Sequence, residues 1–161
     1  MELNALATRA VALLRDKGLT VATAESCTGG LIAAALTDVA GASRVFGTGV
    51  VSYSCDCKRK LLGVSAATLA AEGAVCAATA ARMAEGVRRV ADAAIGVSVT
   101  GEAGPVAAED RPVGTVFIAL SDSRDTVTEE HHFAGDRAAI RRQAAEAVLS
   151  LLIRRLEVTV C

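Results

Sequence analysis

The chain has 161 residues, of which 52% are hydrophobic and 2% aromatic, and its formal net charge is −1. A chain of this length is expected to form one domain, residues 1–161, and to bury roughly two thirds of its unfolded surface. The nearly balanced charge lacks the basic face typical of nucleic-acid-binding proteins. No apolar run approaches the roughly 20 residues needed to cross a bilayer, so a membrane-spanning protein is not expected.

The N-terminal sequence, MELNALATRAVALLRDKG, carries charges throughout and does not read as a secretory signal. A cytoplasmic location is therefore expected. The five cysteines include no CxxC pair, which predicts free thiols in a reducing compartment. The mean hydropathy of +0.42 implies apolar surface and favours a homo-oligomer, such as a dimer.

The first half of the chain alternates between helical and extended patterns. Apolar residues at helical spacing predict an amphipathic helix over 2–17, followed by a short buried strand over 19–24 and a helix over 30–37. Residues 44–54 read as a second strand, whose two glycines indicate a bulge or a close backbone approach. A short helix is expected over 58–64.

The second half begins with the longest helical pattern, over 73–93, and a buried strand over 93–101. Two further strand-like runs, 113–121 and 126–133, are separated by a short polar turn, and a final helix begins near Asp136. Early alternation followed by a late antiparallel pair predicts an α/β fold. We expect a three-layer α/β/α sandwich with a mixed, mostly parallel sheet.

Three short segments rich in glycine or hydroxyl groups each follow a predicted strand. They are residues 25–30, 53–58 and 100–105. Ligands of open α/β sheets bind at the carboxyl ends of the strands, where such segments converge. The three segments therefore form the candidate site.

The first segment, within TAESCTGG, places Ser26 between a strand and a helix. Unpaired N–H groups and the helix dipole favour negative charge at a helix N-terminus. Ser26 could therefore be a nucleophile, with the N–H groups of residues 27–30 receiving an oxyanion or a phosphate. The alternative is structural: Ser26 or Thr28 caps the helix, and the glycines allow tight packing.

A serine nucleophile needs a base. His131 and His132 are adjacent in a strand, so their side chains point to opposite faces, and they read as surface or edge residues. Lysine is then the activator, although its ordinary pKa of about 10.4 must first be lowered by burial or a nearby cation. Lys58 is the candidate and Lys60 its competitor; alternatively, both are solvated residues of a surface helix.

Read together, the segments resemble a known family across nearly the whole chain. The motifs occur in the order TAESCTGGLIAAALTDVAGASRVFGTGVVSYS, KRKLLGV, EGAV, SVTGEAGP, RPVGTV and GDRAAIRRQA. They are similar to the C-terminal domain of the competence/damage-inducible protein CinA. Stand-alone members of that family are nicotinamide-nucleotide amidohydrolases, and this chain resembles a stand-alone member.

The resemblance implies hydrolysis of the carboxamide of nicotinamide mononucleotide to nicotinate mononucleotide and ammonia, with no metal or other cofactor. Ser26 would be the nucleophile, Lys58 the base and Tyr53 a proton relay or orienting group. One of Arg137, Arg141 and Arg142 could hold the phosphate, unless they form a solvated helix face capped by Asp136. The residues assigned to substrate binding are Cys27, Thr28, Gly29, Gly30, Cys55, Thr100, Gly101, Gly104 and Arg142.

The chain departs from the family pattern at two places in the candidate site. Cys55 stands where the family usually has an Asn, and Glu102 stands where it has an Ile. The following loop, VAAEDR, lacks the usual glycines and adds Glu109 and Asp110, so it should be stiffer and more negative. Such a loop would not favour a phosphate.

Three hypotheses remain from the sequence. The first is an active amidohydrolase on a pyridine mononucleotide. The second is a catalytically silent or substrate-shifted binding protein that keeps the fold. The third is a thiol or metal site formed by Cys27, Cys55 and Cys57, for which no histidine or CxxC pair completes a four-ligand set.

Overall fold

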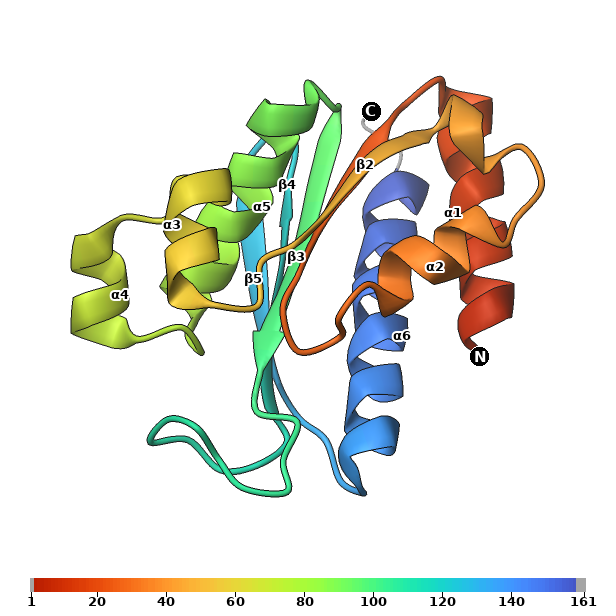
Figure 1. Cartoon of the computed structure of the whole chain (residues 1–161). Helices are drawn as coiled ribbons and strands as arrows, with labels where there is room; N and C mark the ends of the chain where they lie inside the picture. The colour runs from red at the N-terminus through yellow and green to blue at the C-terminus, as the bar shows by residue number, and fades with distance from the viewer. Residues whose placement is uncertain (1, 159–161) are drawn as a thin grey trace.

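Figure 1 shows the computed structural model, which describes residues 2–158. The strands are β1 (Val21–Glu25), β2 (Phe46–Val51), β3 (Ile95–Gly101), β4 (Thr115–Ser121) and β5 (Thr126–His132). The helices are α1 (Leu3–Lys17), α2 (Leu31–Thr37), α3 (Cys55–Leu62), α4 (Ala66–Glu72), α5 (Ala77–Ala91) and α6 (Arg137–Glu157), with a 3-10 turn at Ala42–Arg44.

The five strands form one mixed sheet in the order β2-β1-β3-β4-β5. β1 lies between β2 and β3 and is parallel to both, whereas β4 is antiparallel to its neighbours β3 and β5. Four of the strands therefore run in one direction and β4 opposes them. The predicted α/β fold with a mixed, mostly parallel sheet is confirmed.

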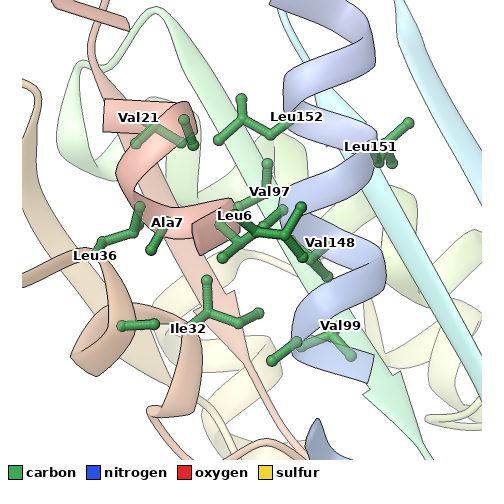
Figure 2. Packing of buried hydrophobic residues seen from close by; sticks show 14 of the residues in the cluster. Leu6, Ala7, Val21, Ile32, Leu36, Val97, Val99, Val148, Leu151 and Leu152 are labelled. Carbon is green, nitrogen blue, oxygen red and sulfur yellow. The ribbon is translucent and has the colours of Figure 1, made fainter. Parts of the chain in front are cut away.

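Helices cover both faces of the sheet, as Figure 1 shows: α1, α2 and α6 lie on one side, and α3, α4 and α5 on the other. The larger core lies under α1, α2 and α6, where Leu6, Ile32 and Val148 meet the strand residues Val97 and Val99 (Figure 2). A smaller cluster, which includes Ala22, Leu62 and Met83, fills the other side. The small side chains of both clusters allow the helices to approach the sheet closely.

The predicted elements differ from the structure mainly on the α3–α5 side. The helix predicted over 58–64 begins earlier, at Cys55, because the Ser54 hydroxyl accepts a hydrogen bond from the Cys57 N–H (3.1 Å) and caps it. α4 was not predicted. The helix predicted over 73–93 begins only at Ala77, after Cys76, whose thiol accepts from the Thr79 N–H.

Candidate active site

The carboxyl ends of β1, β2 and β3 lie at one edge of the sheet, and the three segments selected from the sequence leave from there. Because β2, β1 and β3 are parallel neighbours, the chain after each strand emerges beside the others. Two backbone hydrogen bonds join them: the Ser26 N–H donates to the Val99 carbonyl (3.1 Å), and the Ser52 N–H donates to the Glu25 carbonyl (2.8 Å). The segments thus meet as expected.

Ser26 and Lys58 meet at this edge. The Nζ atom of Lys58 lies 2.9 Å from the Oγ atom of Ser26, and it also contacts the carbonyl oxygens of Ser52 (2.7 Å) and Tyr53 (3.3 Å). Lys58 projects from α3 and is 1% exposed. Lys60, its competitor, is 61% exposed and pairs with Asp56. Of the two lysines, only Lys58 reaches Ser26.

The surroundings of Lys58 favour the neutral amine. Burial lowers the pKa of the Lys58 ammonium below its ordinary value of 10.5, against the opposing negative charge of Glu109. A neutral amine has two N–H bonds and one lone pair. In the structure Nζ donates to the carbonyls of Ser52 and Tyr53 and to Ser26 Oγ. In the neutral amine the two carbonyls can accept both N–H bonds, and the third contact would then reverse, with the lone pair accepting the Ser26 hydroxyl proton. The arrangement suits a lysine that removes a proton from a serine.

The N-terminus of α2 binds a carboxylate of the chain itself. The buried carboxylate of Glu25 occupies it, accepting hydrogen bonds from the N–H groups of Ile32 (2.9 Å) and Ala33 (3.0 Å) and from the Thr28 hydroxyl (2.7 Å). Gly29 and Gly30 have φ angles of 61° and 101°, in the left-handed region that favours glycine. Both glycines therefore shape the turn, and their assignment to substrate binding stays a prediction.

Arg141, on α6, holds the turn that follows Ser26. Its Nε atom donates to the Cys27 carbonyl (3.1 Å) and one terminal nitrogen donates to the Thr28 carbonyl (2.9 Å). A trans peptide points its C=O and N–H in opposite directions, so the Thr28 N–H points away from Arg141. Within residues 2–158, the N–H groups of Cys27 and Thr28 donate no hydrogen bond.

Tyr53 and Arg137 form the mouth of the site. The Tyr53 side chain is 60% exposed, and its hydroxyl accepts a hydrogen bond from Arg137 (2.8 Å). Another nitrogen of Arg137 donates to the Gly104 carbonyl. The Tyr53 hydroxyl therefore lies with Arg137, outside the hydrogen bond between Ser26 and Lys58, which suits an orienting role better than proton relay.

A cleft of about 250 Å³ lies between Ser26 and Lys58 at one end and Tyr53 and Arg137 at its mouth. Of the residues assigned from the sequence, its lining includes Ser26, Cys27, Tyr53, Cys55, Lys58, Thr100, Gly101 and Gly104. Thr28, Gly29, Gly30 and Arg142 lie outside the lining. Of the three arginines considered for phosphate, Arg137 alone lines the cleft, while Arg141 is occupied by the turn.

The loop between β3 and β4 forms one wall of the cleft, and Figure 1 shows this connection projecting beyond the end of the sheet. The Glu102 carboxylate accepts hydrogen bonds from the N–H groups of Ala108 (2.9 Å) and Glu109 (2.8 Å). Glu109 in turn accepts from the N–H groups of Ala74 (2.8 Å) and Val75 (3.1 Å). Both acidic side chains therefore hold the loop in place.

The thiols and histidines near the site have other roles. Burial raises the pKa of the Cys27 thiol to about 12, which keeps it protonated near neutral pH. In the part of the chain that the structure describes, no group of three or more His, Cys, Asp or Glu side chains could hold a metal ion. His131 and His132 pair with Glu129 and Glu130 on the edge strand β5.

The family model of the CinA C-terminal domain matches residues 3–156. The chain belongs to this family. A CinA-like protein of Geobacter sulfurreducens is 49% identical over 154 residues, and one of Frankia casuarinae is 49% identical over 144 residues. These matches cover 95% and 89% of this chain but only 37% and 33% of the relatives. The chain thus spans about a third of the length of these curated relatives.

Solved structures of CinA proteins share the fold. A CinA superfamily protein from Klebsiella pneumoniae has a TM-score of 0.94 and 38% identity, covering 97% of this chain and 98% of its own. A CinA superfamily protein from Escherichia coli has a TM-score of 0.93 and 34% identity, covering 95% of this chain and 90% of its own. No helix within residues 2–158 of this CinA domain is long and apolar enough to cross a membrane.

Sequence reasoning missed two parts of this CinA site. Arg141 was considered only for phosphate, although it holds the turn after Ser26. Glu25 opens the first site segment and was given no role of its own, although its carboxylate caps α2. A carboxylate near a helix N-terminus can accept its free N–H groups, but Glu25 lies several positions before the N-cap residue Gly30, so the spacing alone does not predict this contact. No local signal indicates the role of Arg141, which depends on a contact between distant segments.

Proposed function

We propose that this CinA domain is an amidohydrolase that cleaves the carboxamide of nicotinamide mononucleotide to nicotinate mononucleotide and ammonia. The observation that carries the proposal is the 2.9 Å separation of Lys58 Nζ and Ser26 Oγ inside a cleft. An amide is a poor electrophile, so a serine that attacks it must be both deprotonated and aimed. The buried Lys58 would deprotonate the serine, and the turn that carries Ser26 would aim its oxygen at the amide carbon.

In the first half of the proposed reaction, Ser26 Oγ attacks the carboxamide carbon while neutral Lys58 accepts the hydroxyl proton. A tetrahedral intermediate forms, with negative charge on the former carbonyl oxygen. Lys58 then passes its proton to the amide nitrogen, the C–N bond breaks and ammonia leaves. The product of this half is an ester between Ser26 and the nicotinoyl group.

In the second half, water replaces ammonia. Lys58 accepts a proton from the water as its oxygen attacks the ester carbonyl, and a second tetrahedral intermediate forms. The C–O bond to Ser26 then breaks, and Lys58 returns the proton to the serine oxygen. The sum is amide plus water to carboxylic acid plus ammonia, and both catalytic groups return to their starting states.

The oxyanion of each intermediate needs donors. We assign the N–H group of Cys27 to this role, because it donates no hydrogen bond to another residue within residues 2–158 and Cys27 lines the cleft. The N–H group of Thr28 follows it in the same turn and is the second candidate donor, although Thr28 itself lies outside the lining. The Cys27 carbonyl is held by Arg141, which turns the Thr28 N–H away from α6. Arg141 would thus be a positioning residue for the oxyanion donors.

We assign the binding of the substrate phosphate to Arg137. Its guanidinium donates to two neutral acceptors, the Tyr53 hydroxyl and the Gly104 carbonyl, and so keeps its charge for an anion at the cleft mouth. Arg142, the earlier choice, lies outside the cleft lining, and the Asp136 side chain does cap α6 by accepting from the Ala139 N–H (2.8 Å).

The test is ammonia release from nicotinamide mononucleotide by wild type, Ser26→Ala and Lys58→Met. We expect turnover by wild type and its loss in both variants. Lys60→Met is the matched control, because Lys60 lies on the same helix, is 61% exposed and does not line the cleft. A folded wild type that releases no ammonia would refute the proposal and favour the silent or substrate-shifted binding protein.

A further inference from the structure

Two carboxylates, Glu102 and Glu109, and the guanidinium of Arg137 line the candidate cleft without ion-pair partners within residues 2–158. Glu102 is buried, at 4% exposure, whereas Glu109 is half-buried and is the more accessible of the two acids. The Glu109 carboxylate accepts hydrogen bonds only from the N–H groups of Ala74 and Val75, and Arg137 donates only to neutral oxygens. Among residues 2–158, neither side chain forms a salt bridge, although both line the same cleft. Both charges are therefore available to a ligand.

Glu109 is held in place from two sides. Its own N–H donates to the Glu102 carboxylate (2.8 Å), which fixes the backbone at this position. Its carboxylate packs so closely on Gly73 that a Cβ atom at that glycine would lie 2.7 Å from Oε2. The carboxylate therefore cannot swing across to Arg137 or Lys58 without breaking two hydrogen bonds. Its negative charge is a fixed property of the wall.

The two charges lie toward different ends of the cleft. Glu109 accepts from the Ala74 N–H, and the Ala74 carbonyl accepts from the hydroxyl of Thr100 (2.8 Å). Thr100 follows Val99, whose carbonyl accepts from the Ser26 N–H. This chain of contacts places Glu109 toward the buried end where Ser26 lies. Arg137 binds the hydroxyl of the largely exposed Tyr53 and so marks the mouth. A ligand that spans the cleft meets a negative charge near the reacting group and a positive charge farther out.

We infer that Glu109 is a specificity-determining residue that favours a positively charged ring beside Ser26, while Arg137 binds the anionic end of the same molecule. The inference rests on the proposed function and specifies the charge pattern of its substrate. Nicotinamide mononucleotide has this pattern, because its pyridinium ring is a permanent cation and its phosphate an anion. The reduced dihydronicotinamide form keeps the carboxamide, ribose and phosphate but loses the ring charge.

The test compares these two forms as ligands of the Ser26→Ala protein, which lacks the nucleophile and can be titrated without turnover. By isothermal titration calorimetry at one ionic strength, we expect the oxidised form to bind about five- to tenfold more tightly than the reduced form. In Ser26→Ala/Glu109→Gln the ratio should fall toward one, mainly through weaker binding of the oxidised form. Ser26→Ala/Asp110→Asn is the control, because Asp110 neighbours Glu109 but does not line the cleft.

Four results would overturn the inference. Equal affinities of Ser26→Ala for the two forms would show that the protein does not select for the ring charge. An unchanged affinity ratio in Ser26→Ala/Glu109→Gln would show that another residue causes the selectivity. A parallel loss of both affinities would make Glu109 a structural residue of the loop. Failure of both forms to bind also overturns it, and ammonia release by wild type then decides whether the proposed function falls with it.

Discussion

The amine of Lys58 lies 2.9 Å from the hydroxyl of Ser26, although the two residues are 32 positions apart in the chain. Two neighbouring parallel strands produce this contact, because β1 ends just before Ser26 and β2 ends shortly before α3, which carries Lys58. The Ser54 cap starts α3 at Cys55 and so sets which residue of its first turn faces the serine. The fold thus brings the two side chains into direct contact.

If the pair is one unit, removing either member should remove the whole chemical step. We expect Ser26→Ala and Lys58→Met each to lower kcat for ammonia release by about 10³-fold or more, and the double variant to be no slower than the single ones. Single-turnover measurements with each protein check this. Losses that multiply in the double variant would mean that the two residues act independently.

The pH dependence of kcat/KM should follow the protonation state of Lys58. Lysine accepts a proton only when neutral, and its neutral fraction increases with pH, so kcat/KM should rise with pH and level off. Because burial lowers the pKa of Lys58, the midpoint should lie below 10.5. A pH–rate profile measures this, with Lys60→Met as a control that leaves the midpoint in place. A rate that falls as pH rises through this range would contradict a lysine base.

Arg141 should affect catalysis without contacting the substrate. Arg141→Met frees the carbonyls of Cys27 and Thr28, so the oxyanion donors lose their fixed direction. We expect kcat to fall by about 10- to 100-fold with little change in KM. Arg142→Met, an exposed neighbour on the same helix, should leave both parameters unchanged. A change in KM alone would indicate instead that Arg141 binds substrate.

Gly86 should be intolerant of even one added methyl group. A Cβ atom there would lie 2.0 Å from the Leu62 carbonyl oxygen, so α3 and α5 would have to separate. We expect Gly86→Ala to lower the free energy of unfolding by about 1–3 kcal/mol, despite the higher helix propensity of alanine. Activity should fall as well, because α3 carries Lys58.

Gly47→Ala is the matched control for this substitution, because no atom lies within 4 Å of the added carbon. Chemical denaturation of both variants gives the comparison. Equal stabilities of Gly86→Ala and wild type would show that α3 and α5 can move apart at no cost.

Much of the fold could be predicted because its signals are local. The apolar pattern of residues 2–17 reflects one buried face of a helix, and that of residues 93–101 reflects one buried strand. Both elements are present in the structure, as α1 and β3. The convergence of the three site segments follows from the same pattern, since parallel strands bring their carboxyl ends to one edge. The short α4 was missed because none of its residues is buried, so it has no apolar face to read.

The remaining parts of the site depend on contacts between distant segments. Arg141 meets the Cys27 carbonyl 114 positions away, and Arg137 meets the Tyr53 hydroxyl 84 positions away. The sequence predicts the start of α6 near Asp136, and the structure agrees. Which arginine of α6 reaches the cleft depends instead on how the helix is rotated against the sheet, and that rotation depends on packing between distant segments. The acids at this loop were expected only to repel a phosphate. Two of them, Glu102 and Glu109, also accept hydrogen bonds from backbone N–H groups and so hold the loop in place.

The contact between Tyr53 and Arg137 gives the protein a built-in optical reporter. The chain contains one tyrosine and no tryptophan, so nearly all of its near-ultraviolet fluorescence comes from this single ring. That ring lies at the mouth of the candidate cleft, bound to the arginine assigned to the phosphate. An occupant of the cleft would change the quenching of this one fluorophore, so ligand entry can be followed in the unlabelled, unmodified protein.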